Sequence, residues 1–357
     1  MRIITLLKDA QNKLYMKVIK SALLILILFF GLYGFGQNTY FSQFHNSPFT
    51  LNPALTGLSF NGSFRFITNY RYEFGYQNFE TYENSLDVMI PTRKHTFGAG
   101  VQVLQDYFSN QSYAVSKISA LGAYHFVLDR YGKQNLSLGA YINAYQQVDK
   151  SLSALQDSIQ VGNVVSFADY GIGAHWYNVQ DRQPFLSAGL AIYKIKQNDG
   201  QKFYDDDGIH LDIFRVHFHG DARFWLNRSN SVTSRFAYYG FNNNHRVSAG
   251  VEFEHYLGLF MLGSRLQNRI VTLRRRTSIF GGIYTRIPDG VFFMVGGEIM
   301  SFRISVSYDA YFSGLGGSTD NPWYGKDYMR NAFEVNLAYK GLVAKRKSRG
   351  VRAPKLR

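Results

Sequence analysis

Three side chains with metal-binding chemistry are spaced two residues apart between positions 217 and 221. His217, His219 and Asp221 would share one face of a β-strand, because successive side chains alternate sides, and imidazole and carboxylate groups are common metal ligands. Arg215 and Arg223 belong to the same face, and two cations would weaken a bound metal ion. We therefore expect the polar lining of an interior here, and neither a metal nor a cofactor.

Two other charged runs could bind ligands. Asp205-Asp206-Asp207-Gly208 suggests calcium, but the oxygen-ligand spacing of a calcium loop and its final Glu are missing, so a solvated acidic loop is the better interpretation. Arg274-Arg275-Arg276 would ring a pore mouth, contact an anionic partner or lipid head group, or form a solvated strand end.

Local signatures of catalysis are absent from the sequence. It contains no Gly-x-Ser-x-Gly, no His-Glu-x-x-His and no phosphate-binding loop. Outer-membrane hydrolases can carry Ser and His on strands without such a signature, and His125, His217 and His255 are strand histidines of that kind. We predict that the chain is not an enzyme, with an outer-membrane hydrolase as the least favoured alternative.

The elements that position these residues are β-strands. From Phe64 to Gly75 aromatic and charged residues alternate strictly, which only a strand separates onto two faces. In a soluble sandwich the apolar face would point into a core, and in a membrane barrel it would point to lipid. The pattern recurs over residues 214–227, 246–254, 303–312 and 333–339. Such long strands, with apolar faces rich in Phe and Tyr, predict an all-β protein, a single transmembrane antiparallel up-and-down β-barrel over residues 60–340.

Connection lengths support a barrel, because bacterial barrels have short periplasmic turns and long outer loops. The predicted periplasmic turns are short: Pro91–Lys94, Asp129–Gly132, Val179–Arg182 and Asn227–Asn230. The predicted outer loops Asp149–Ser166 and Gln197–Gly208 are long. Alternating runs number fifteen, but an even number is expected, so one run between Tyr256 and Ser301 is split wrongly and about 14 strands are predicted. The Gly314–Asn331 connection is expected outside or folded into the pore.

Residues 1–36 have the pattern of a secretory signal peptide. Lys17 and Lys20 precede the apolar stretch 22–32, and a small-residue cleavage site follows. Met16 stands directly before this pattern, so translation is expected to start at either Met1 or Met16.

The next segment, residues 37–59, is predicted to be extended and turning. Pro48 and Pro53 exclude one continuous helix, and Gly57 supplies backbone freedom before the first strand. Its aromatic residues are expected to pack against an existing wall. Two interpretations are open, a tethered N-terminal tail and a plug or docking element.

Composition narrows the class of protein. Without Cys the chain forms no disulfide and carries no lipid anchor on Cys. Of the net charge of +14, residues 1–36 carry +4 and residues 340–357 carry +8, which leaves +2 for the body. A nearly neutral body argues against nucleic-acid binding, and residues 341–357 form a basic C-terminal tail that is either solvated or bound to an acidic partner.

Several motifs resemble one known family. Phe41-Ser42-Gln43-Phe44, then Asn52-Pro53-Ala54-Leu55-Thr56-Gly57 and Asn69-Tyr70-Arg71, are similar to the opening of the PorP/SprF family of type IX secretion membrane proteins of Bacteroidota. Near the C-terminus, Arg303–Asp309 followed by Ser313–Gly316, and Phe333–Leu337, resemble its closing strands. The likeness spans nearly the whole mature chain. Val306 replaces an aromatic residue of the family pattern and the middle loops match poorly, so the resemblance does not indicate which cargo this chain handles.

The resemblance implies an outer-membrane barrel of the type IX secretion and gliding machinery that helps secrete or anchor specific cargo through C-terminal sorting domains. It implies periplasmic ring and peptidoglycan-linked partners beside outer-membrane lipid, with cargo at the outer mouth and the Tyr40–Gly57 segment and basic tail facing periplasmic machinery. The expected partner-contact residues are Tyr40, Phe41, Phe44, Asn52, Pro53, Trp323, Tyr324, Lys345, Arg346 and Lys347. The main rival is a passive diffusion porin.

Overall fold

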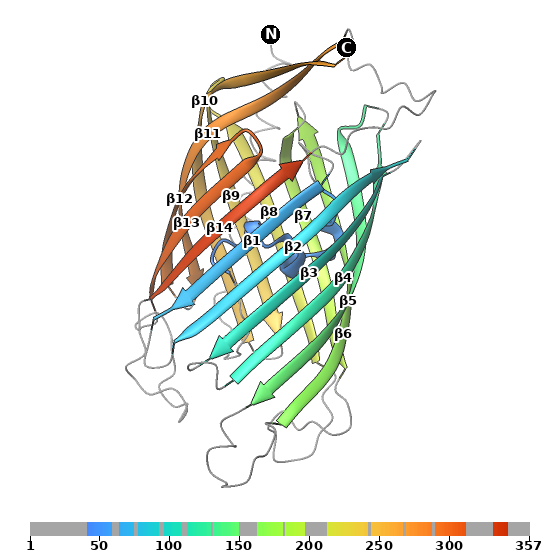
Figure 1. Cartoon of the computed structure of the whole chain (residues 1–357), viewed down its shortest axis with the longest axis vertical. Helices are drawn as coiled ribbons and strands as arrows, with labels where there is room; N and C mark the ends of the chain where they lie inside the picture. The colour runs from blue at the N-terminus through green and yellow to red at the C-terminus, as the bar shows by residue number, and fades with distance from the viewer. Residues whose placement is uncertain are drawn as a thin grey trace, which may run out of the picture.

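The computed structural model shows fourteen antiparallel strands closed into one barrel, in which each strand pairs with its sequence neighbours and β1 pairs with β14 (Figure 1). It describes residues 41–58, 64–74, 78–92, 96–108, 113–129, 131–149, 163–180, 183–196, 213–241, 244–266, 269–287, 290–311 and 331–341. No helix in these described ranges is long and apolar enough to cross a bilayer. The fourteen strands confirm the predicted fold class and number.

The strands, in chain order, are β1 (Phe64–Glu73), β2 (Phe79–Pro91), β3 (Thr96–Phe108), β4 (Tyr113–Val127), β5 (Gln134–Asp149), β6 (Asn163–Gln180), β7 (Gln183–Lys196), β8 (Ile213–Trp225), β9 (Asn230–Phe241), β10 (Asn244–Leu266), β11 (Arg269–Ile287), β12 (Gly290–Ile299), β13 (Phe302–Tyr311) and β14 (Ala332–Gly341). The extra alternating run between Tyr256 and Ser301 is not a separate strand, because it belongs to the long strands β10 and β11.

Side chains alternate between the lumen and the outer surface, as the sequence pattern predicts. In β8, His217 and His219 are 3% and 2% exposed inside the barrel, whereas Phe218 between them is 45% exposed outside. The same alternation places Glu252 inside and Val251 outside on β10. An apolar outer surface around a polar interior is the arrangement that a lipid bilayer requires of a barrel.

The two ends of the barrel differ. At one end, here called the short-turn end, the strands are joined by residues 92–95, 128–133, 181–182, 226–229, 267–268 and 300–301. At the opposite, long-loop end, the connections include residues 150–162, 197–212 and 312–331. The three longest connections thus share one end, as predicted, although this end also has two-residue connections at 242–243 and 288–289.

The N-terminal segment differs from the prediction of an extended chain. It forms three short helical turns, η2 (Phe44–Asn46), α2 (Pro48–Leu51) and η3 (Pro53–Leu55). The prolines do prevent one continuous helix, but each begins a new turn, because the first helical position needs no backbone N–H and suits the fixed φ of proline. Gly57 has a φ of 77°, which uses the expected backbone freedom.

Candidate functional site: the plugged lumen

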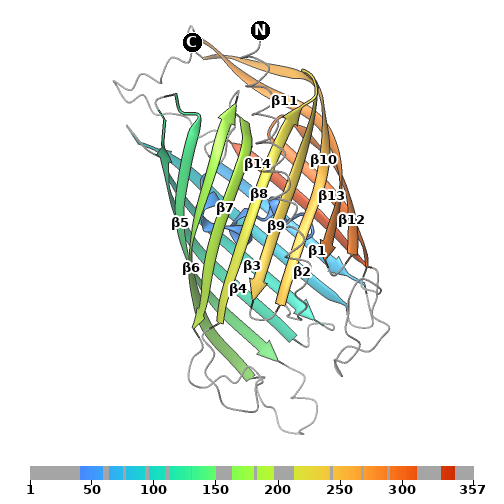
Figure 2. The same ribbon diagram turned by 180° about the vertical axis from the view of Figure 1, so that it is seen from behind.

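Residues 41–58, here called the plug, lie inside the barrel about midway along it (Figures 1 and 2). The chain contacts β13 and β14 through Ser42 and Gln43, reaches β6 through Asn52 and ends beside β2 at Gly57. It therefore crosses the lumen from one wall to another. Of the two interpretations left open by the sequence, the structure shows the plug.

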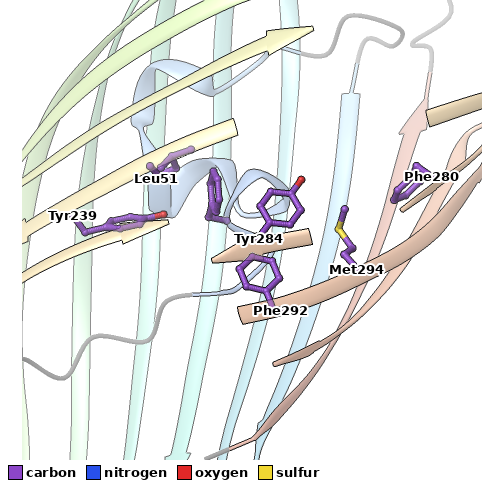
Figure 3. Close-up of a cluster of buried hydrophobic side chains, with 8 residues drawn as sticks. Leu51, Tyr239, Phe280, Tyr284, Phe292 and Met294 are labelled. Atoms are coloured by element: carbon purple, nitrogen blue, oxygen red, sulfur yellow. The ribbon is translucent and has the colours of Figure 1, made fainter. Parts of the chain in front are cut away.

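Apolar side chains anchor the plug to one wall. Phe44 and Leu51 belong to a buried cluster whose other members are Ala237, Tyr239, Phe280, Tyr284, Phe292 and Met294 of β9, β11 and β12 (Figure 3). Phe44 meets Tyr284 edge-on at 6.2 Å between ring centroids. On the opposite wall Phe49, which is 3% exposed, packs in a second cluster with Tyr141 and Tyr193. The plug is thus held by packing from both sides.

A buried ionic group fixes the start of the plug. Arg71 of β1 contacts Asp309 at 2.9 Å and Glu334 at 3.2 Å, and its whole side chain is inaccessible to solvent. The backbone N–H groups of Ser42 and Gln43 donate to Glu334 at 2.8 and 3.0 Å, and the Ser42 hydroxyl donates to Asp309. Because buried charges are tolerated only when paired and hydrogen-bonded, the plug completes the pairing of this group.

A second ionic group lies beside η2. Glu252 accepts from Arg235 at 2.8 Å and from Arg303 at 3.2 Å, and it is fully buried. His45 of the plug stacks on Tyr284 at 5.7 Å and lies 3.8 Å from Glu252. Burial, and then the nearby Arg235 guanidinium, hold the pKa of His45 well below its usual range. The imidazole is therefore neutral at pH 7, and it packs here as a flat ring.

Asn52 joins the plug to three strands. Its side-chain oxygen accepts from the N–H of Ala54 at 2.9 Å and caps η3, while its amide nitrogen donates to the carbonyls of Ala174 at 3.0 Å and Leu190 at 3.3 Å. The same nitrogen lies 3.1 Å from His219. Only a side chain with both an acceptor and a donor at this length makes all of these contacts.

Glycines on the wall make room for the plug. A Cβ atom at Gly98 would lie 2.1 Å from the Thr56 carbonyl oxygen, and one at Gly139 would lie 2.4 Å from the Ala54 nitrogen. At Gly173 it would lie 2.0 Å from the Asn52 side-chain oxygen. Side-chain carbons essentially never approach other atoms so closely. The strands β3, β5 and β6 therefore accept the plug only because these positions lack a side chain.

We expect Asn52→Asp to loosen the plug. Aspartate keeps the cap on Ala54 but directs a second oxygen at the Ala174 and Leu190 carbonyls, which leaves buried acceptors without a donor at a cost of about 1–3 kcal/mol. Amide hydrogen exchange of residues 41–57 should accelerate by roughly tenfold or more. The control is Asn227→Asp, because the exposed Asn227 side chain acts only as an acceptor, from Ser229 and Asn230. Unchanged plug exchange in Asn52→Asp would contradict the assigned contacts.

The strand histidines have structural partners. His125 lies 2.5 Å from the Ser137 hydroxyl, but its other ring nitrogen lies 2.9 Å from the Thr56 carbonyl, so the pair is sealed under the plug. His217 contacts the Leu51 carbonyl at 3.3 Å, and His255 contacts Asn230 at 2.6 Å at a turn. Within the described ranges, no group of three His, Cys, Asp or Glu residues is arranged to hold a metal ion.

A cavity of about 90 Å³ borders the plug beside Phe49 and Thr50. Polar side chains of β3, β4, β5 and β8 line it, among them Gln102, Lys117 and Asn143. A void of this size holds a small number of water molecules. It is not an aqueous channel of the kind that crosses a wide porin.

The structure places some predicted partner-contact residues and leaves others outside its described ranges. Phe41, Phe44, Asn52 and Pro53 are buried against the barrel's own wall, and their contact with a partner stays a prediction. Residues outside the described ranges are Tyr40, Trp323, Tyr324, Lys345, Arg346, Lys347 and Asp205–Asp207, as are the side chains of Arg274–Arg276. Glu334 and the wall glycines contact the plug although they are far from it in the sequence, so no local pattern indicates these contacts.

A closed barrel with an apolar outer surface, a polar lumen and an internal plug defines an integral β-barrel of the outer membrane. The family model described as type IX secretion system membrane protein PorP/SprF matches residues 34–339, and the chain belongs to this family. It is therefore a barrel component of the type IX secretion machinery. The stretches that carried the resemblance meet in space, since Ser42, Arg71, Asp309 and Glu334 form one buried group.

Comparisons with other proteins give only distant likenesses. No curated protein matches the sequence. Among solved structures, the toluene transporter TodX of Pseudomonas putida is 10% identical with a TM-score of 0.45, covering 87% of this chain and 95% of TodX. A FadL homologue of Pseudomonas aeruginosa is 12% identical with a TM-score of 0.39, covering 78% of this chain and 89% of the homologue. BamA of Haemophilus ducreyi lacking POTRA domains 1–3 is 11% identical with a TM-score of 0.38, covering 78% of this chain and 70% of the BamA chain. None of these structures is similar enough for its ligand or partner to be assigned to this chain.

Proposed function

We propose that this barrel is a closed platform of the type IX machinery, which helps secrete or anchor specific cargo at the cell surface. Cargo would dock by its C-terminal sorting domain at the long-loop end, facing the outside, while the short-turn end faces periplasmic ring and peptidoglycan-linked components. The observation that carries this proposal is the plug, a segment of the protein's own chain that crosses the lumen about midway along the barrel. A platform needs no open lumen, whereas a diffusion porin does.

The proposal predicts that cargo display depends on the long loops. A strain lacking the chain would be complemented with the wild type, with a variant whose residues 151–161 and 198–211 are replaced by short Gly/Ser connections, or with a variant lacking residues 342–357. We expect the loop variant to lose most surface display of a cargo that carries a sorting domain, measured by surface antibody labelling. Barrel assembly is checked by the heat-dependent shift of the folded barrel on gels.

Two outcomes would contradict the platform role. The first is normal cargo display in the strain that lacks the chain altogether. The second is normal display by the loop variant, which would remove the long-loop end from cargo docking. A display defect in the variant lacking residues 342–357 would assign the basic tail to the machinery contact, and normal display would count against that part of the proposal.

The porin alternative makes a different prediction. A passive porin would conduct ions steadily in a planar bilayer, and its deletion would leave cargo display intact. Steady conduction does not fit a lumen crossed by a buried, hydrogen-bonded segment. The hydrolase alternative needs an accessible nucleophile and base, but the described Ser137–His125 pair lies beneath the plug.

A further inference from the structure

Strands β10 and β11 extend well beyond their neighbours. Strand β9 pairs with β10 only as far as His255, and β12 pairs with β11 only from Ser278. Past these positions Gly258–Leu266 pairs solely with Arg269–Thr277, forming a hairpin here called the overhang. Nine residues of antiparallel strand span about 30 Å. The overhang projects from the short-turn end, where β10 connects to β11.

A β-bulge lies at the base of the overhang. The register between β10 and β11 shifts between Tyr256 and Gly258, which leaves Leu257 as an extra residue. Bulges bend the strand that contains them and increase its twist. Both views show the two strands turning across the end of the barrel beyond this region (Figures 1 and 2).

The overhang has two open edges. In the described part of the chain, no strand pairs with the outer edge of Gly258–Leu266 or of Arg269–Thr277. An isolated two-stranded hairpin is marginally stable in water, and an open edge offers a row of unpaired N–H and C=O groups to another strand. A hairpin of this length is therefore a template for strand addition.

The sequence of the overhang specifies the charge of its partner. It contains Arg265, Arg269, Arg274, Arg275 and Arg276 and no Asp or Glu. Five cations within twenty residues would repel a second copy of the same hairpin, so edge pairing between two copies of this chain is disfavoured. An acidic segment would be attracted to it.

We infer that the overhang binds an extended, acidic segment of a periplasmic component of the same secretion machinery by edge-strand addition. Backbone hydrogen bonds along the open edge supply affinity, and the arginines select an acidic partner. This inference rests on the proposed function, which places the short-turn end in the periplasm.

The test uses the full chain in detergent and each periplasmic component of the machinery, purified separately. Three forms are compared: the wild type, a variant in which Asn-Gly replaces residues 258–277, and a variant with all five arginines changed to Gln. An acidic component should bind the wild type, slow amide exchange within residues 258–277 and fail to bind the shortened variant. The Gln variant should bind about tenfold or more weakly, since several exposed ion pairs act together.

Three results would overturn the inference. These are equal binding of a component to the wild type and the shortened variant, binding without slower exchange in the overhang, and the absence of binding by every component. Vesicles containing phosphatidylglycerol provide a further arm, because slower exchange there alone would assign the overhang to lipid head groups. Cargo display in the strain lacking the chain is scored separately, so failure of the platform role is distinguishable from failure of this contact.

Discussion

Replacing Gly139 with alanine is expected to displace the plug and open the barrel to ions. The added Cβ would lie 2.4 Å from the nitrogen of Ala54 and 2.5 Å from the carbonyl carbon and oxygen of Pro53. These are backbone atoms and cannot rotate away as a flexible side chain could. Overpacking typically costs 1–3 kcal/mol, so the displaced state should become roughly ten- to a hundredfold more populated. Salt efflux from proteoliposomes measures this change.

The matched control is Gly122→Ala on the neighbouring strand β4. A Cβ at Gly122 meets nothing closer than 4.0 Å, so the same chemical change should leave efflux at the wild-type rate. Equal efflux from Gly139→Ala and the wild type would mean that the plug does not depend on its close approach to β5.

Arg71→Met is expected to lower the free energy of unfolding by about 3–5 kcal/mol, because it removes the nearest cation from the buried carboxylates of Asp309 and Glu334 and leaves Asp309 with only the more distant Arg286, at 3.9 Å. These side chains are only 4% and 0% exposed, so water cannot replace the guanidinium without opening the structure. The hydrogen bonds of Ser42 to the same carboxylates should weaken as well. Urea unfolding in lipid vesicles, followed by tryptophan fluorescence, reports the change.

Two further variants test whether Arg71 stabilises the barrel through its charge or through its packing. Arg228→Met removes an exposed arginine at a turn and should leave the unfolding midpoint unchanged. Combining Arg71→Met with Asp309→Asn and Glu334→Gln removes the unpaired charges and should recover most of the lost stability. No recovery in this triple variant would argue that Arg71 contributes packing rather than charge pairing.

The barrel could be predicted from sequence because its strands obey a local rule. Phe218 lies between His217 and His219, and this order assigns one residue to one face and two to the other, while the recurrence of the pattern in long strands identifies the faces as lipid and lumen. The lengths of the predicted connections likewise indicated which end of the barrel carries the long loops. The strand number was ambiguous only where β10 and β11 run past their neighbours, because the apolar run 259–262 and the arginine run 274–276 interrupt the alternation there.

The plug could not be fixed from sequence, because its contacts are distant along the chain. Ser42 and Glu334 are separated by 292 positions, and no local pattern signals such a pair. The two prolines were informative about helix breaks, but whether each one ends a helix or begins a turn depends on the wall around it. Gly139 and Gly173 looked like ordinary strand glycines until Ala54 and Asn52 were found against them.

The central claim, that the chain is an outer-membrane barrel closed by its own N-terminal segment, is tested most directly by conductance in planar bilayers. The wild type should show no sustained channel, whereas a chain lacking residues 41–57 should conduct steadily, because the lumen it leaves is lined by polar side chains. Steady conductance by the wild type, equal to that of the shortened chain, would contradict the account.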